Sequence, residues 1–326
     1  MRSSILITAL LLAGHAIAQP ERGIPLTDDD RKAVSSVRIT LLSTMLTDIT
    51  GIGEWGFAAL IEADGTRILF DTGHRPNTVL DNAQELGIEL ADIEDVVLSH
   101  NHVDHTGGLL SLRTALSKKN PDALRRVHVA RGIFQKRANP RGFSAHMSEL
   151  RTAYEETGGT FIVYDEAAEI LPGVWLTGPV PRIHRERNWN PHGRVHTDQG
   201  LIVDEIPESQ SLVLNTNEGL IMISGCGHAG MINTMEHARN VIRERDIVAA
   251  IGGFHLLRAD DDHLGWTAGK MRELGVRDFI GAHCTGINAV HTLREQLGLP
   301  RNNAVVGAVG ASFELGKGID AGILAR

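Results

Sequence analysis

The chain has 326 residues, of which 42% are hydrophobic and 22% are charged. This balance is typical of a globular protein that can bury a substantial core, organised as one large domain or as one domain with an appended segment. The formal net charge of -8 argues against a nucleic-acid binder, which needs a basic face to neutralise phosphates, and gives no attraction to anionic membrane surfaces.

The N-terminal residues have the pattern of a secretory signal peptide. Arg2 precedes an apolar run over residues 5–14, and small residues at 16–18 form an A-x-A cleavage site. The run is too short to span a bilayer, although a membrane anchor is the alternative reading. We predict a signal peptide over residues 1–18, a loose charged arm over 19–36 and a folded domain over 37–326, in a periplasmic or secreted protein without membrane insertion after cleavage.

The cysteine content does not indicate a disulfide framework. Only Cys226 and Cys284 occur, too few for such a framework even in an exported chain where disulfides are permitted. Each cysteine stands in a short motif that also contains histidine, so its position near a possible metal site is more informative than the number of cysteines.

The first half of the folded part is predicted to contain strands followed by helices. Residues 37–46 alternate as a strand, and residues 57–73 are typical of two strands joined by a turn at Asp64-Gly65. Residues 76–88 place apolar side chains on one helical face, residues 94–100 form a short strand, and residues 107–119 a further helix.

The second half repeats this order. We expect strands near 125–132, 159–165 and 173–178, then a long irregular loop over 179–200. After the loop we expect strands at 201–206, 211–216 and 219–225, followed by alternating helices and strands over 231–307. Strands followed by alternating helices and strands in both halves predict an α/β fold, an αββα sandwich of two mixed β-sheets with helices on the outer faces.

The stretch SHNHVDHTGG, residues 99–108, places three histidines and an aspartate close together at the end of a predicted strand. His100 and His102 can both reach one ion from such a turn, while Asp104 and His105 can reach a second ion beside it. Imidazole and carboxylate ligands suit zinc, and also manganese or iron. The alternatives, a solvated polar loop or a set of hydrogen-bonded core histidines, explain the spacing poorly.

Three further motifs offer ligands to complete the two sites. Cys226 and His228 lie in ISGCGHAG, His255 lies in IGGFHL, and His283 with Cys284 lies in IGAHCTG. Each motif follows an apolar strand, and in α/β sheets ligands gather at the carboxyl ends of strands. The repeated placement predicts one shared site.

These motifs together resemble a known family. ILFDTG, VVLSHNHVDHTGGL, GCGHAGMINT, GGFHL and HCTG, in this order, resemble the metallo-β-lactamase superfamily over about residues 38–310. The last motifs are most similar to the 7,8-dihydropterin-6-methyl-4-(β-D-ribofuranosyl)aminobenzene-5′-phosphate synthase-like subgroup. The resemblance implies the sandwich fold already predicted and a centre of two divalent metal ions, with Zn²⁺ first and Mn²⁺ or Fe as alternatives.

The resemblance also implies a ligand set. His100, His102 and His228 would hold the first metal, and Asp104, His105 and His283 the second, with Asp104 and His283 as the catalytic residues. Asp71 in FDTG would orient a metal-binding histidine, or serve as a turn residue, or both.

Two positions keep more than one interpretation. Cys226 competes with His228 for a ligand position, because many members of the superfamily bridge their metals with a residue after a similar strand. His255 is a ligand, a substrate contact or a buried histidine, of which we favour contact or a structural role.

The predicted activity follows from the predicted centre. Two adjacent cations lower the pKa of a shared water, so a metal-bound hydroxide can attack an ester without a covalent intermediate, with Asp104 able to accept a proton. We expect an exported metal-dependent hydrolase acting on a small, anionic substrate, such as a phosphodiester or another ester.

The expectation of an anionic substrate that carries a ring follows from a loop rich in basic and aromatic residues. Its members are Arg182, His184, Arg185, Arg187, Trp189 and His196, for which solvated loop charges are the alternative explanation.

Other functions fit the motifs less well. A synthase-type transferase on a pterin or pyrophosphate-like substrate is the first alternative, but a signal peptide places the protein away from cytoplasmic pterin synthesis. A lactonase or β-lactamase-type ring hydrolase is the second. A noncatalytic metal binder is a third, disfavoured because structural zinc sites are usually mononuclear and rich in cysteine.

Overall fold

Two β-sheets pack face to face in the computed structural model, which describes residues 31–139 and 142–324. The predicted signal peptide and most of the predicted arm lie outside these residues. Within the described part of the chain, no helix has both the length and the apolar character needed to cross a membrane.

The first sheet has eight strands in the order β19-β18-β1-β2-β3-β4-β5-β8. Its strands are β1 (Val37–Ser43), β2 (Ala58–Ala63), β3 (Thr66–Phe70), β4 (Asp95–Val97), β5 (Arg126–Ala130), β8 (Thr160–Tyr164), β18 (Ser312–Glu314) and β19 (Gly318–Asp320). The predicted hairpin is formed by β2 and β3, and Asp64 (φ 46°) and Gly65 (φ 81°) both adopt the positive φ that its tight turn requires.

The second sheet has seven strands in the order β17-β16-β15-β14-β13-β10-β9. Its strands are β9 (Ala168–Leu171), β10 (Val174–Leu176), β13 (Ser211–Thr216), β14 (Gly219–Ser224), β15 (Ile247–Gly252), β16 (Asp278–Gly281) and β17 (Ala304–Val306). Every residue of β13, β14 and β15 is buried, because this sheet is covered on both faces.

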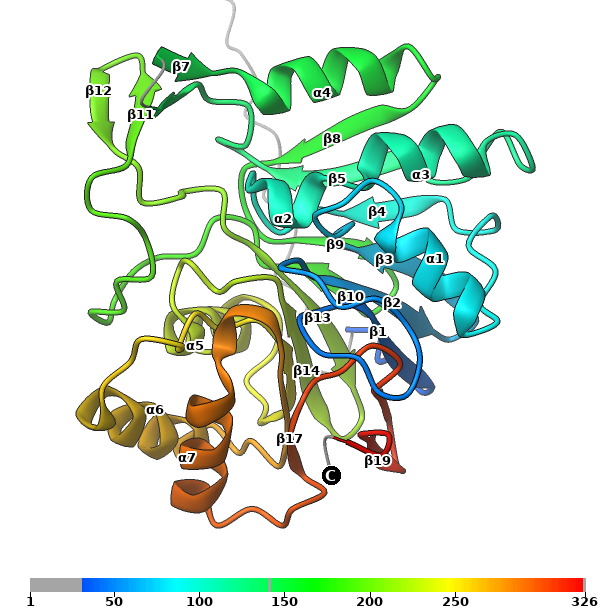
Figure 1. Cartoon of the computed structure of the whole chain (residues 1–326). Helices are drawn as coiled ribbons and strands as arrows, with labels where there is room; N and C mark the ends of the chain where they lie inside the picture. The colour runs from blue at the N-terminus through cyan, green and yellow to red at the C-terminus, as the bar shows by residue number, and fades with distance from the viewer. Residues whose placement is uncertain (1–30, 140–141, 325–326) are drawn as a thin grey trace, which may run out of the picture. The chain divides into compact units, whose positions relative to one another are not determined.

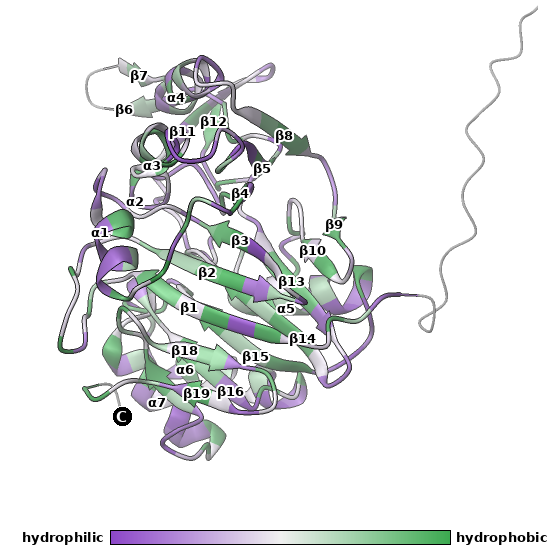
Figure 2. Cartoon of the chain, turned by 90° about the vertical axis from the view of Figure 1, so that its right-hand side faces the viewer, coloured by the Kyte–Doolittle hydropathy of each residue, from purple (hydrophilic) through white to green (hydrophobic). Residues whose placement is uncertain are grey.

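The helices cover the outer faces of the two sheets (Figure 1). They are α1 (Thr78–Glu85), α3 (Leu109–Leu116) and α4 (His146–Glu155) beside the first sheet, and α5 (Met231–Val241), α6 (Asp261–Glu273) and α7 (Ile287–Leu297) beside the second. Side chains such as Ile39, Phe70 and Ile223 fill the layer between the sheets, and Figure 2 shows hydrophobic residues along most of the strands. The predicted αββα sandwich is therefore confirmed.

A third, small sheet departs from the predicted strand series. β11 (Arg194–Thr197) and β12 (Gly200–Val203) form a hairpin, joined by β6 (Arg137–Asn139) and β7 (Gly142–Ser144). The prediction of one irregular loop over 179–200 was thus wrong at its C-terminal end. Gly200, with φ 100°, lets the chain turn back so that Thr197 pairs with Gly200, and the apolar β12 lies exposed on this hairpin instead of in the second sheet.

The predicted loose arm also ends earlier than residue 36. Val34 is buried in the layer between the sheets, and its backbone N–H donates to the carbonyl of Asn215 at 2.7 Å. The burial of this apolar side chain and its bridge to Thr216 fix the segment before β1.

A buried carboxylate links three strands of the first sheet. Asp95 on β4 accepts hydrogen bonds from Arg126 (2.7 Å) and from His128 (2.8 Å) on β5, and His128 contacts Tyr164 Oη on β8. Burial alone would raise the pKa of Asp95, but the hydrogen bonds from His128 and Arg126 lower this pKa from 3.8 to about 2. The ionised carboxylate therefore stabilises the folded state.

We expect Asp95→Asn to lower the free energy of unfolding at pH 7, because Arg126 and His128 lose a charged partner. The expected loss is moderate, about 2 kcal/mol, because Arg126 is only partly buried and solvent screens its charge. Since the folded pKa of Asp95 is depressed, its contribution is present above pH 4 and is lost as the pH falls toward 2. Urea unfolding at several pH values measures this difference. Asp122→Asn, which breaks an exposed pair with Arg125, is the control. Equal effects of the two substitutions would contradict this role of Asp95.

Candidate metal centre

The histidine motif lies where two parallel strands of the first sheet end. β3 and β4 run in parallel, with Phe70 opposite Val97, so Asp71 and the residues after Val97 emerge at the same edge. The chain then turns into the short helix α2 (Val103–Thr106), which follows His102 directly. This turn allows alternate residues of the motif to face one point.

The downstream motifs follow parallel strands of the second sheet. Ser224, Gly252 and Gly281 are aligned at the ends of β14, β15 and β16. The segments after these strand ends carry Cys226 with His228, His255, and His283 with Cys284. The predicted gathering of motifs at carboxyl ends of strands is what the structure shows.

His100, His102 and His228 form a first cluster. The centroids of their rings lie 4.6 Å apart for His100 and His102, 4.6 Å for His100 and His228, and 4.9 Å for His102 and His228. The Nε2 atoms of His100 and His228 are buried without a hydrogen-bond partner. Buried polar atoms normally have a partner, so these lone pairs suit a metal ion.

Asp104, His105 and His283 form a second cluster. Asp104 Oδ2 lies 3.7 Å from His105 Nε2 and 3.2 Å from His283 Nε2, and the two rings are 5.0 Å apart. His105 and His283 are buried. The two imidazoles and the carboxylate have the donor chemistry of a divalent metal site.

Cys226 lies between the two clusters. Its Sγ is 3.2 Å from His105 Nε2. The donor atoms of Cys226, His100 and His228 lie within 4.8 Å of one another, and so do those of Cys226, His105 and His283. The sequence left Cys226 and His228 as competitors, whereas the structure brings both residues into the centre at different places.

Partners outside the clusters hold the rings in place. Asp71 Oδ2 accepts from His105 Nδ1 at 2.7 Å, and Asp71 also accepts from the N–H and Oγ of Ser99. Ser99 Oγ lies 2.9 Å from His100 Nδ1, and the carbonyl of Asn188 accepts from His228 Nδ1. With Nδ1 engaged on His100, His105 and His228, the Nε2 lone pairs of these three rings are directed into the centre.

Burial and mutual repulsion keep the first cluster uncharged. Burial, and then the neighbouring histidines, hold the pKa values of His100 and His228 well below the usual value, and burial lowers the pKa of His102 to about 4. Neutral imidazole is the form that binds metal, so these residues are ready to bind at neutral pH.

The second cluster is charged instead. Burial opposes ionisation of Asp104, but the nearby His283 and His105 hold the pKa of its carboxyl well below the usual value. Burial also opposes protonation of His105, but the carboxylate of Asp71 outweighs it and raises the pKa of His105. A carboxylate that stays ionised suits the coordination of a cation.

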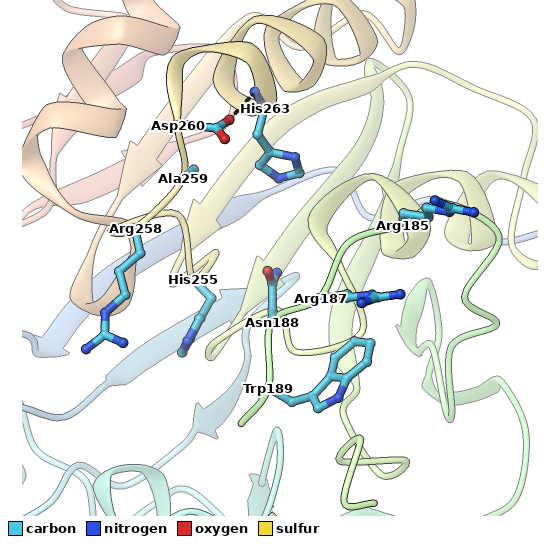
Figure 3. Close-up of a pocket in the computed structure, with 9 residues that line it drawn as sticks. All are labelled: Arg185, Arg187, Asn188, Trp189, His255, Arg258, Ala259, Asp260 and His263. Carbon is cyan, nitrogen blue, oxygen red and sulfur yellow. Dashed lines mark hydrogen bonds between the residues drawn. The ribbon is translucent and has the colours of Figure 1, made fainter. Parts of the chain in front are cut away.

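The structure has a pocket of about 380 Å³, and Figure 3 shows the residues that line it. Its lining residues are Arg185, Arg187, Asn188, Trp189, His255, Arg258, Ala259, Asp260 and His263. His255 connects the pocket with the centre, because its ring lies 4.9 Å from that of His228. Three arginines thus line a pocket next to the candidate metal centre.

The predicted basic loop divides into two groups. Arg185, Arg187 and Trp189 line the pocket, whereas His184 pairs with Glu236 at 2.9 Å and His196 lies on β11 against Phe143. His184 and His196 therefore do not line this pocket.

Arg182 does not line the pocket but contacts two segments next to it. Its guanidinium lies 4.7 Å from the ring of Trp189 and donates to the carbonyl of His228. This arginine therefore joins the pocket wall to the segment that carries the cluster.

Two buried glutamates that the sequence did not single out fix the loops around the centre. Glu208 accepts from the backbone N–H of Asn101, between the first two histidines of the motif, and is held by Arg137 at 2.7 Å. Glu186 accepts from the backbone N–H groups of residues 232 and 233 at the start of α5. Neither has a local sequence signal, because their partners lie more than 40 residues away in the chain.

Comparison with known proteins agrees with this geometry. A family model described as "Metallo-beta-lactamase superfamily" matches residues 56–182. The chain is 28% identical over 249 residues, 74% of its length, to 7,8-dihydropterin-6-methyl-4-(beta-D-ribofuranosyl)-aminobenzene-5'-phosphate synthase of Methanocaldococcus jannaschii, of which the match covers 84%.

Solved structures show the same fold. Tm1679, described as a metal-dependent hydrolase of the beta-lactamase superfamily, superposes with a TM-score of 0.70 at 27% identity, covering 86% of this chain and 99% of that one. A diphosphatase from the PhnP family superposes with a TM-score of 0.51 at 15% identity, covering 86% and 98%, which shows the fold alone. The predicted resemblance to the metallo-β-lactamase superfamily is confirmed, and the chain has the fold of that superfamily.

Proposed function

We propose that the protein is an exported, metal-dependent hydrolase of small anionic esters, with phosphodiesters as the first substrate class. The observation that carries the proposal is the convergence of two ligand clusters on Cys226 beside a pocket with three arginines. Export is supported by the signal-peptide pattern of residues 1–18.

The donor set fits two divalent ions. His100, His102 and His228 would hold one, and Asp104, His105 and His283 the other, with Cys226 beside both. Imidazole with one thiolate and one carboxylate favours Zn²⁺, with Mn²⁺ or Fe as alternatives. Two such ions, when bound, lower the pKa of water and stabilise negative charge on the reacting group.

The residues of the chain supply binding and orientation. Arg185, Arg187 and Arg258 line the pocket and would bind an anionic group through charge-assisted hydrogen bonds. The indole of Trp189, backed by Arg182, offers an apolar face for a ring. Asp104, ionised at neutral pH, can accept a proton at Oδ2, next to His283.

A synthase-type transferase is the second candidate. The curated relative from Methanocaldococcus jannaschii is named as a synthase, and an arginine-lined pocket would hold a pyrophosphate as well as a phosphodiester. Product formation without net hydrolysis would identify this activity. Hydrolysis of neutral lactones makes less use of the three arginines.

Removal of one ligand tests the metal assignment. We expect chelation to abolish activity, and His102→Ala to lower the metal content below two ions per chain, because the first cluster then lacks one of its three imidazole ligands and binds its ion more weakly. Elemental analysis after gel filtration measures the content. His196→Ala, in the exposed hairpin, is the matched control. Two ions retained by His102→Ala would refute the assignment.

Asp71 provides a test of orientation without loss of a ligand. We expect Asp71→Asn to weaken metal affinity by roughly 10- to 100-fold, because the amide is a poorer acceptor for His105 Nδ1 and Ser99. Competition with a chromophoric chelator reports the affinity. An unchanged affinity would mean that Asp71 serves only as a turn residue.

The pocket is tested with paired substrates. Among chromogenic phosphodiester, lactone, carboxyl ester and cephalosporin substrates, we expect hydrolysis chiefly of the phosphodiester. Arg187→Ala should lower kcat/KM for it by about 10-fold or more, because a charge-assisted hydrogen bond is lost. A neutral ester should be affected far less, and Arg301→Ala, outside the pocket, is the control. Equal losses on both substrates would contradict an anion-binding role.

A further inference from the structure

Cys284 is a buried thiol that belongs to neither histidine cluster. Its Sγ lies 3.2 Å from Cys226 Sγ, and both cysteines are free and buried. Cys284 stands in the 3-10 turn His283–Thr285 that follows β16, next to a proposed metal ligand. The pair of metal ions proposed above leaves this thiol without a role.

His255 faces Cys284 from the end of the neighbouring strand β15. Its backbone N–H points to Cys284 Sγ at 3.3 Å, and its Nδ1 is buried without a hydrogen-bond partner. His255 has φ 51°, a left-handed conformation that is costly for a residue with a side chain and persists where the surroundings hold it in place. One nitrogen of the His255 ring lies within 4.8 Å of both thiol sulfurs.

We propose that Cys226, His255 and Cys284 form a third, thiolate-rich metal position, which takes a thiophilic divalent ion such as Cd²⁺. The donor atoms of the three residues lie within 4.8 Å of one another. Two sulfurs and one imidazole form a softer donor set than either histidine cluster. Both thiols release their protons to solvent when the ion binds.

His255 also lines the arginine pocket, so the proposed position lies next to one wall of that pocket. Cys226 also belongs to the donor sets of both histidine clusters, so an ion at the third position shares this sulfur with the proposed pair. The third position is distinguished from that pair by Cys284 and His255.

The test uses the reduced, full-length mature protein loaded with excess Cd²⁺ and freed of unbound ion by gel filtration. We expect three Cd²⁺ per chain in the wild type and two in both Cys284→Ser and His255→Ala. The ultraviolet charge-transfer absorption of cadmium thiolate should fall by about half in Cys284→Ser, since one of two thiolates is lost. His291→Ala, which removes an exposed histidine of α7, should keep three ions.

Two Cd²⁺ in the wild type would overturn the third position and leave the proposed pair intact. Three ions retained in both Cys284→Ser and His255→Ala would also overturn it, because the extra ion would then lie elsewhere. Fewer than two ions in the wild type would overturn the third position together with the proposed function.

Discussion

The buried carboxylate of Asp71 is the contact on which the candidate centre depends. It accepts hydrogen bonds from His105 directly and from Ser99, which in turn contacts His100, so one carboxylate orients a ring in each cluster. Space for this contact is provided by Gly225 across the sandwich, because a Cβ there would lie 2.5 Å from Asp71 Oδ2 and 2.1 Å from Ser99 Oγ. The two sheets therefore meet at the centre with no room for a larger residue.

The sandwich places ligands from distant segments on this contact. Parallel strands end at one edge of each sheet, and the loops after those ends supply the histidines and both cysteines. The loop before β11 closes the site on one side, where Asn188 contacts His228 and Arg187 lines the pocket. The same loop thus contacts a proposed metal ligand and carries an arginine of the pocket, so in the proposed function it would link metal binding to substrate recognition.

Local patterns in the sequence were enough to predict the layers and the motif. Apolar runs mark β13, β14 and β15 because these strands are buried on both faces, and the spacing of His100 and His102 needs only one turn. Composition could not separate Arg187, which lines the pocket, from His184 and His196, which do not, because all three lie in one polar segment. The contact between Asn188 and His228 joins residues 40 positions apart and leaves no local pattern.

The motif and the distant histidines are proposed to hold two metal ions in separate clusters. Anomalous X-ray diffraction at the zinc edge, from crystals of the zinc-loaded protein, locates both ions in one experiment. We expect one anomalous peak among His100, His102 and His228 and another among Asp104, His105 and His283. The absence of a peak from either cluster in fully loaded crystals would contradict this proposal.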